Sequence, residues 1–341
     1  MTHAAFPIAR PEEYAVGQGP WHPQAGSTQL PGAPAPLAYW VKRISLLIPI
    51  ALACGFSETA SAQEAAMAVA QGMGSTTRAN LGDGGAVFTA PATIWLSSAY
   101  EVSIGARIGT GESRLYQVSA QDAKTGPVAL GVQWMRHHTD TSPSAGDLPG
   151  WKRPGDSLEN PTVTSVFGAS LGSGGVHHLF SLAAGARYYT RIAPVTGEEA
   201  ELNAVVSVGG IVLDQLTLTM TAENLIPQDG FNGAPLSLGT GTHWQPTDSF
   251  SLALDTLADF ESKEDKVAFS PMVGTEFVIA EVVPLRIGWY RDGVSGQGVV
   301  TAGIGVSNEV AGFNYGGQLQ VGEGTPDKPG HWHGLSLRAS F

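Results

Sequence analysis

The sequence lacks what a covalent or metal-based framework needs, because it holds a single cysteine among 341 residues. One cysteine excludes a disulfide framework, a four-cysteine zinc site and a CxxC redox pair. Charge is scarce as well: charged residues make up 14% of the chain, against roughly 25% in an average soluble domain. The 30 acidic and 18 basic residues give a net charge of −12, which is the wrong sign for a protein that binds a nucleic-acid backbone.

Long apolar runs are also missing. The one extended run, residues 44–56, is shorter than the ~20 residues that a membrane-spanning helix requires. A basic pair precedes the run and an A-x-A pattern follows it, which is the order of a secretory signal peptide. We therefore predict a signal peptide over 41–62, with cleavage marked by Ala60, Ala62 and Gln63.

Three other interpretations of this region stay open. Cys54 follows a short segment that weakly resembles a lipoprotein box, although Ala51 is a poor first residue for one. The apolar run would otherwise be a buried helix containing Pro49. Residues 1–40 are rich in proline and glycine without periodicity, so we expect a disordered extension upstream of a true start at Val41.

What the sequence has in abundance is glycine, 44 residues, and alternation with a period of two. Over Tyr100–Gly109, apolar residues occupy every second position and small, polar or charged residues occupy the others. Such alternation over ten positions predicts a strand. One segment, 203–212, is apolar on both faces and would also fit a partly helical structure.

About fourteen segments show this strand pattern, and turn residues separate them. An even number of strands allows the first and last to pair and leaves no open edge in lipid. We predict an all-β fold: an antiparallel transmembrane β-barrel over 99–341, with a small N-terminal hatch or plug segment at 63–98. The predicted strands lie near 100–109, 114–123, 128–138, 162–172, 177–191, 202–212, 215–224, 235–245, 250–260, 267–280, 283–291, 298–308, 312–322 and 332–341.

Three features favour a membrane barrel over a secreted soluble β-sandwich used for adhesion, the alternative left open. Many segments have about ten residues, the length that crosses a bilayer at a tilt. Aromatic residues recur near strand ends, among them Trp95, Tyr100, Trp134, Phe313 and Trp332. The chain also stops on an alternating segment with a terminal phenylalanine, which resembles the signal read by the outer-membrane barrel assembly machinery. The residues that carry this signal are Gly334, Leu335, Leu337 and Phe341.

The segment Gln71–Gly74 and the segment 79–92 resemble the start of FadL/PorV-type outer-membrane barrels. The segments 121–131, 216–227 and 283–290 resemble that family's later hairpins and strands. An alanine, Ala90, replaces the asparagine of the family's Asn-Pro-Ala element. The resemblance implies a hatch that kinks to open a path; a static plug or a simple lead into the first strand remains an alternative. The implied hatch residues are Gly72, Met73, Gly74, Gly84, Gly85 and Pro91.

Strand parity places four acidic and five basic side chains on the inward faces of the barrel. Opposite charges in a confined lumen can pair and close space. We interpret them as a network that forms a plugged interior together with the N-terminal segment, and ordinary solvation of the lumen is the alternative. The lumen charge network consists of Glu101, Arg107, Arg187, Arg191, Glu223, Asp255, Glu276, Arg286 and Arg338.

Catalytic and metal-binding patterns are weak in the sequence. No GxSxG, HExxH or P-loop motif stands in a suitable context, so we expect no enzyme, no catalytic residues and no cofactor. The pairs His137-His138 and His177-His178 point to opposite strand faces, and His331 and His333 share a face without a carboxylate or cysteine. We expect no metal site.

The favoured function is passive transport of small hydrophobic compounds across the bacterial outer membrane. The alternative is a non-transporting PorV-like barrel that anchors or shuttles secreted or surface proteins. The expected partners are outer-membrane lipid, the barrel assembly machinery, and a hydrophobic small molecule or a secreted protein. No nucleic acid is expected.

Overall fold

The computed structural model describes residues 68–81, 84–109, 113–139, 162–174, 179–193, 197–213, 215–226, 235–262, 266–321 and 330–341. The predicted signal peptide, with Ala60, Ala62 and Gln63, and the predicted extension 1–40 lie outside the described residues.

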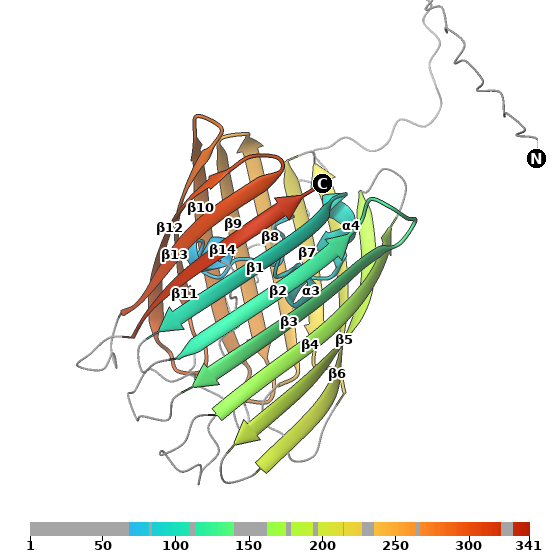
Figure 1. The fold of residues 1–341 in the computed structure, drawn as a ribbon, viewed down its shortest axis with the longest axis vertical. Helices are drawn as coiled ribbons and strands as arrows, with labels where there is room; N and C mark the ends of the chain where they lie inside the picture. The colour runs from blue at the N-terminus through green and yellow to red at the C-terminus, as the bar shows by residue number, and fades with distance from the viewer. Residues whose placement is uncertain are drawn as a thin grey trace, which may run out of the picture. The chain divides into compact units, whose positions relative to one another are not determined.

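Fourteen antiparallel strands form a closed barrel (Figure 1). Each strand pairs with its neighbours in sequence, and β1 pairs with β14 over nine residue pairs from Glu101↔Ser340 to Gly109↔Trp332. Closure leaves no unpaired strand edge. The strands are β1 (Tyr100–Gly109), β2 (Arg114–Asp122), β3 (Ala129–Thr139), β4 (Thr162–Gly174), β5 (Phe180–Ala193), β6 (Gly197–Leu213), β7 (Leu216–Glu223), β8 (Ser237–Thr247), β9 (Phe250–Asp259), β10 (Ala268–Ile279), β11 (Val283–Arg291), β12 (Gly298–Ser307), β13 (Ala311–Val321) and β14 (His331–Ser340).

The predicted all-β barrel of about fourteen strands is confirmed, and the predicted strand ends lie within three residues of the observed ones except in β6. β6 begins at Gly197, and 203–212 is strand as predicted, so the alternative of a partly helical structure there is wrong. Its inner face packs on helix α4 (Ala92–Ser97). A Cβ on Gly209 would lie 3.2 Å from Leu96 Cδ1. Beside α4 both faces of β6 can therefore be apolar, because lipid-facing and helix-facing positions alternate there, whereas Glu201, Asn203 and Ser207 make the rest of its inward face polar.

The connections differ in length between the two ends of the barrel. At the end where β1 begins and β14 stops, they are short, and the longest covers 123–128. At the opposite end they include 140–161 and 224–236. We call these the turn end and the loop end. Outer-membrane barrels have short periplasmic turns and longer extracellular loops.

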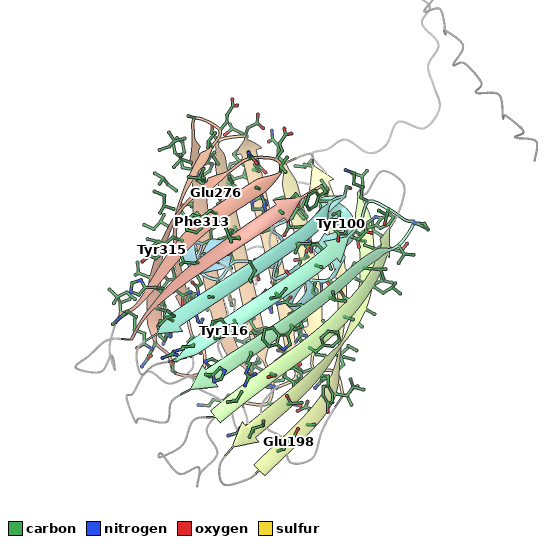
Figure 2. All side chains as sticks on the ribbon, viewed as in Figure 1. Tyr100, Tyr116, Glu198, Glu276, Phe313 and Tyr315 are labelled. Atoms are coloured by element: carbon green, nitrogen blue, oxygen red, sulfur yellow. The ribbon has the colours of Figure 1, made fainter. Side chains whose placement is uncertain are left out.

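The outer face of the barrel is apolar. On β1, Val102, Ile104 and Ile108 are exposed, while Glu101, Ser103 and Arg107 between them are buried. Large exposed apolar surfaces of this kind mark contact with lipid or a partner, not with water. Figure 2 shows labelled outward aromatics at both ends of the barrel, with Tyr100 and Phe313 near the turn end. The outward aromatics of the turn end are Tyr100, Phe180, Trp244, Phe277, Phe313 and Phe341.

Two aromatic residues singled out near strand ends belong to the interior and not to this outer band. Trp95 lies in α4, and Trp332 faces inward from β14; both are buried. Trp134 faces outward, but from within β3. An aromatic residue beside a turn pattern can therefore face either side, because parity and not proximity to the end decides its direction.

Three short helices lie inside the ring of strands (Figure 1). Helix α2 (Ala68–Gly72) contacts β1 and β11–β14, α3 (Ala86–Thr89) contacts β3 and β4, and α4 contacts β3–β6. Among the described residues, no helix is long and apolar enough to cross a membrane. We call the described residues 68–81 and 84–98 the hatch segment.

Candidate functional site

The nine predicted lumen charges occupy inward-facing positions on their strands. Seven of them are buried, and Glu276 and Arg338 are half-buried. Charged groups in such surroundings are tolerated when other charges and hydrogen bonds compensate them. Their partners show which of them the fold brings together.

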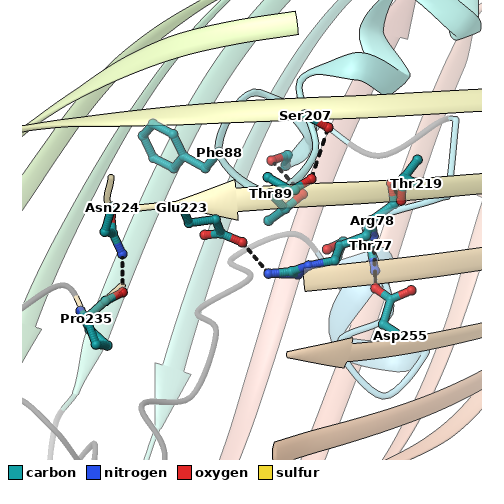
Figure 3. A network of polar contacts seen from close by, with 12 residues as sticks. Thr77, Arg78, Phe88, Thr89, Ser207, Thr219, Glu223, Asn224, Pro235 and Asp255 are labelled. Atoms are coloured by element: carbon teal, nitrogen blue, oxygen red, sulfur yellow. Dashed lines mark hydrogen bonds and ion pairs between the residues drawn. The ribbon is translucent and has the colours of Figure 1, made fainter. Parts of the chain in front are cut away.

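Glu223 on β7 is the centre of the largest group (Figure 3). Its carboxylate accepts hydrogen bonds from both terminal nitrogens of Arg187, each at 3.1 Å to Oε2. Its other oxygen, Oε1, binds Nη2 of Arg78, a hatch residue. Arg187 also donates to the carbonyl of Phe88, and its guanidinium lies 5.8 Å from the centre of the Phe88 ring. One wall carboxylate thus joins two cations, one of them from the hatch segment.

The side chain of Asp255 on β9 binds backbone amides of the hatch. Its Oδ2 accepts hydrogen bonds from the amides of Thr77 and Arg78, at 2.8 and 2.9 Å. From the neighbouring wall, the hydroxyl of Thr219 donates to the carbonyl of Arg78 at 2.9 Å. The hatch backbone at this turn is therefore held by side chains of β7 and β9 (Figure 3).

Two further pairs of lumen charges lie elsewhere on the wall. Arg286 binds Glu276 through Nε at 2.6 Å and Asn314 through Nη1 at 2.8 Å. Arg338 lies 4.0 Å from Glu101 across the β1–β14 closure. The predicted network is thus a set of local groups, of which the Glu223 group and Asp255 contact the hatch. Arg107 and Arg191 are buried on the inward faces of β1 and β5.

The first half of the hatch lies against inward-facing glycines of the wall. A Cβ on Gly288 would come within 2.3 Å of the Gly74 nitrogen, and one on Gly303 within 3.0 Å of the Gly72 Cα. The hydroxyl of Thr301 accepts a hydrogen bond from the Gly74 amide at 2.8 Å and donates to the Gly72 carbonyl at 3.0 Å. Gly74 has a φ of 66°, which a side chain would disfavour. Backbone packs on backbone here, which only glycine permits on both sides.

The second half of the hatch forms an apolar cluster with β3–β6. Phe88 fills the space above Gly168, where a Cβ would lie 2.3 Å from the ring. Val87 and Ile94 fill the space above Gly131 in the same way. Leu81, Met135 and Ile211 are half-buried at the margin of the cluster. Its buried members are Ala86, Val87, Phe88, Ile94, Trp95, Leu96, Ala123, Ala129, Val166 and Tyr189.

The other predicted hatch residues mark turns and helix starts. Met73 is buried against the wall, where Gly274 faces its carbonyl. Gly84 approaches the Ser103 and Ser119 side chains of β1 and β2. Gly85 and Pro91 are the N-caps of α3 and α4.

Sequence reasoning missed several inward-facing charges. Arg78 lies in the hatch, where strand parity cannot predict the direction of a side chain. The only sequence feature that could have singled it out is a lone cation among small polar residues. Glu201 was missed because β6 was predicted to begin after it. Asp259 has inward parity at the end of β9, and that parity would have found it. Asp292 lies in the connection after β11, beyond the reach of strand parity.

Asp292 is buried at the loop end of the barrel. Burial is the main reason that the pKa of its carboxyl is raised to about 7; hydrogen bonds from Ser295 oppose the rise, and the nearby Asp259 adds a smaller contribution to it. Its Oδ1 accepts the Val294 amide and its Oδ2 accepts the Ser295 hydroxyl, both at 2.8 Å. The connection 292–297 is thus folded around this carboxyl.

The predicted assembly-signal residues lie on β14 and at its end. Gly334 faces inward, where a Cβ would clash with the Gln71 side chain, while Leu335 and Leu337 face outward. Phe341 is exposed and contacts Tyr100 with ring centres 5.9 Å apart. Recognition of these residues by the barrel assembly machinery stays a prediction.

The histidine pair His137-His138 points to opposite faces as predicted: His137 is buried and bonds Ser113 at 2.9 Å, and His138 faces outward. Within the part of the chain that the structure describes, no three metal-binding side chains gather.

No protein-family model matches the sequence, and no curated protein matches it either. Solved structures do match the fold. The toluene transporter TbuX of Ralstonia pickettii matches with a TM-score of 0.58 and 11% identity, covering 81% of this chain and 98% of TbuX. The monoaromatic hydrocarbon channel CymD matches with a TM-score of 0.59 and 11% identity, covering 84% and 99%. A FadL homologue of Pseudomonas aeruginosa matches with a TM-score of 0.58 and 10% identity, covering 82% and 99%.

These matches extend over nearly the whole length of each neighbour, so they compare complete barrels and not shared hairpins. Because only about one residue in ten is identical, these matches establish the fold and do not identify a transported compound. The chain therefore has the fold of the FadL-type outer-membrane barrels.

Proposed function

We propose that the protein is a passive channel for small hydrophobic compounds in the bacterial outer membrane, working without a cofactor. The observation that carries the proposal is the apolar cluster formed by the hatch helices and β3–β6 inside a barrel whose other inward positions are largely polar. An apolar surface enclosed by a membrane barrel provides a site for a molecule that water excludes. The structural neighbours TbuX and CymD are described as a toluene transporter and a monoaromatic hydrocarbon channel.

In this proposal the turn end faces the periplasm and the loop end faces the outside. The apolar outer face contacts lipid, and the alternating C-terminal strand with Phe341 serves barrel assembly. The predicted signal peptide would deliver the chain to the periplasm. The length of the connections supports this orientation, and the direction of the outward side chains supports contact with lipid.

The hatch segment and the lumen charges together act as a plug against water and ions in this proposal. Contacts between Glu223, Arg78 and Arg187 cross-link hatch and wall, and the glycine contacts leave no room between the first half of the hatch and the strands β11–β13. Hydrophobic molecules would pass on the opposite side, along the cluster margin at Leu81, Met135 and Ile211. The PorV-like alternative gains no support from the comparisons and stays a prediction.

The test compares uptake of a hydrocarbon with permeation of a hydrophilic solute. Gram-negative cells that express the full chain should take up radiolabelled toluene faster than cells without it. Liposomes that contain the protein should show little swelling in a sugar solution. Fast sugar permeation together with unchanged toluene uptake would contradict the proposal.

A variant at the cluster margin makes the test specific. Met135→Gln keeps the shape of the side chain but places an amide beside the cluster, so toluene uptake should fall about tenfold, as expected for the loss of 1–2 kcal/mol of apolar contact. Met272→Gln is the matched control, because Met272 faces inward from β10 outside the cluster. Heat-modifiable gel mobility verifies that both variants fold. Equal uptake by both variants would show that the cluster is not the route.

A further inference from the structure

The outward face of the barrel carries a group of basic side chains at the loop end of β2, β3 and β14. Four of them are exposed and one, His138, is half-buried. All occupy outward positions of their strands, so they lie on the surface that faces lipid in the proposed function. We call this group the basic patch. It consists of Arg114, Arg136, His138, His331 and His333.

Barrel closure brings these residues together from opposite ends of the barrel sequence. His333 lies opposite Ile108, Ile108 lies opposite Arg114, and Arg114 lies opposite His138. Arg136 is one position along the same face, opposite Tyr116. The patch therefore runs in a row across four adjacent strands, β14, β1, β2 and β3. Figure 2 labels Tyr116 in this region and Tyr315 on the neighbouring strand β13.

Hydrogen-bonding aromatic groups border the patch. The Tyr315 hydroxyl lies 2.6 Å from His333 Nδ1. The rings of His331 and His333 are 5.6 Å apart in an edge-on arrangement. Tyrosine and histidine at the rim of a membrane barrel lie at the level of lipid headgroups, where polar tips meet the aqueous layer.

The charge of the patch stands out against the rest of the outer face. Among the outward strand positions that the structure describes, the loop end has one further base, Arg291 on β11, and one acid, Glu198 on β6. The whole chain carries a net charge of −12. Among the described outward strand positions, the two arginines of the patch thus share one sector of the outer face.

Arg114 lies directly opposite His138, and Arg136 lies on the same outward face opposite Tyr116. Two guanidinium groups therefore lie on one face of neighbouring strands. A phosphate group fits the donor fork of arginine with two parallel hydrogen bonds. Basic clusters beside a membrane also attract anionic lipid headgroups.

We propose that the basic patch binds the phosphate groups of an anionic lipid in the outer leaflet of the membrane. The proposal rests on the outer-membrane placement given above, but not on transport. The bound lipid would cover the seam between β1 and β14, where the barrel closes. Arg114 and Arg136 supply the two guanidinium groups, and the histidines add donors beside them.

The experiment measures lipid binding by the full chain, purified in a neutral detergent, by native mass spectrometry. The probes are bisphosphorylated lipid A, monophosphoryl lipid A and zwitterionic phosphatidylethanolamine. The wild-type protein should prefer bisphosphorylated lipid A, with the monophosphoryl form weaker and phosphatidylethanolamine weakest. Equal binding of all three lipids would overturn the proposal.

The double variant R114Q/R136Q should bind bisphosphorylated lipid A about tenfold more weakly or worse, because two cations near the surface are lost. Arg291→Gln is the matched control, since it removes an outward arginine of the loop end on the distant strand β11, and it should bind as the wild type does. Unchanged affinity of the double variant, or an equal loss in the control, overturns the site. If the double variant does not fold, Arg136→Gln alone and the comparison of lipids decide.

Toluene uptake separates this proposal from the proposed function. Lost lipid A binding with normal uptake supports the lipid site and leaves transport intact. Unchanged lipid A binding overturns the lipid site whatever the uptake rate is.

Discussion

Arg78 shows how single residues connect the hatch to the wall. Its side chain binds Glu223, its amide binds Asp255, and its carbonyl accepts from Thr219. A Cβ on Gly239 would lie 1.7 Å from Arg78 Nε, so the wall has a glycine where this arginine passes. Arg78 is therefore held by a charge pair and also fits against the wall because a glycine leaves space for it.

Replacing Glu223 tests the compensation of these buried cations. Glu223→Gln leaves Arg78 and Arg187 with an uncharged acceptor in a buried site, so the free energy of unfolding should fall by about 3 kcal/mol. Urea unfolding in detergent, followed by gel mobility, measures the change. Asp248→Asn, in the exposed turn between β8 and β9, removes a carboxylate without such partners and serves as the control. Equal stability of the two variants would contradict the assigned pairing.

Asp292 predicts a pH dependence with a definite sign. Its pKa is raised from 3.8 to about 7 by burial, so the folded state holds a proton that the unfolded state releases between about pH 4 and pH 7. This contribution to stability is therefore present below pH 4 and is lost as the pH rises through 7, by at most about 4 kcal/mol.

The measurement is the urea midpoint at pH 5.5 and at pH 8.5. The wild-type protein should lose stability between these values, and Asp292→Asn should lose less, because an amide does not ionise. Asp248→Asn should keep the wild-type loss. A pH dependence identical in all three proteins would show that the Asp292 carboxyl does not contribute.

At the scale of elements, the wall glycines explain part of the high glycine content. Gly131, Gly168, Gly274, Gly288 and Gly316 are inward positions where a Cβ would meet hatch atoms at under 3.0 Å. Each strand keeps its outward apolar residues and lacks an inward side chain where the hatch passes. The inward glycines in the alternating pattern therefore mark where the hatch contacts the wall. This meaning could be recognised only after the structure had shown the path of the hatch.

Gly288→Ala tests this fit. The new methyl group would lie 2.3 Å from the Gly74 nitrogen and 2.4 Å from the Met73 carbonyl carbon, so the hatch backbone has to move. We expect a loss of about 1–3 kcal/mol in unfolding free energy and faster proteolysis within the hatch segment. Gly317→Ala is the control, because its methyl group would lie 3.6 Å from the Tyr315 hydroxyl, which is its nearest contact. A tolerated Gly288→Ala would argue against close contact between hatch and β11.

At the scale of the whole molecule, barrel closure and orientation in the membrane determine which residues contact lipid and which contact water. The register between β1 and β14 joins segments that are more than two hundred residues apart in sequence. It also places Arg114 and His333 in one row on the outer face. A barrel open at this seam would form neither the Arg338–Glu101 contact nor the basic patch.

Two isoleucines of similar exposure test the membrane placement of the outer face. Ile104 is 53% exposed within β1, and Ile192 is 54% exposed near the loop end of β5. Arginine at Ile104 should cost about 2–4 kcal/mol, and arginine at Ile192 about 0–1 kcal/mol, since the cost falls from the bilayer midplane towards the interface. Denaturant unfolding in lipid vesicles measures both. Equal costs would contradict a barrel that spans the bilayer.

The sequence by itself determined the strands, their number and their two faces, because alternation is a local property that a closed sheet preserves. It also determined that nine particular charges face inward. Only the tertiary structure decided which of them meet, since Glu223 finds Arg78 through a hatch whose path follows no period. The same holds for β6 and Trp95, because helix α4, which contains Trp95, packs against the inner face of β6 inside the barrel. The local sequence pattern determines whether a strand side chain points inward or outward. Which side chains contact one another depends on barrel closure and on the hatch that fills the enclosed space.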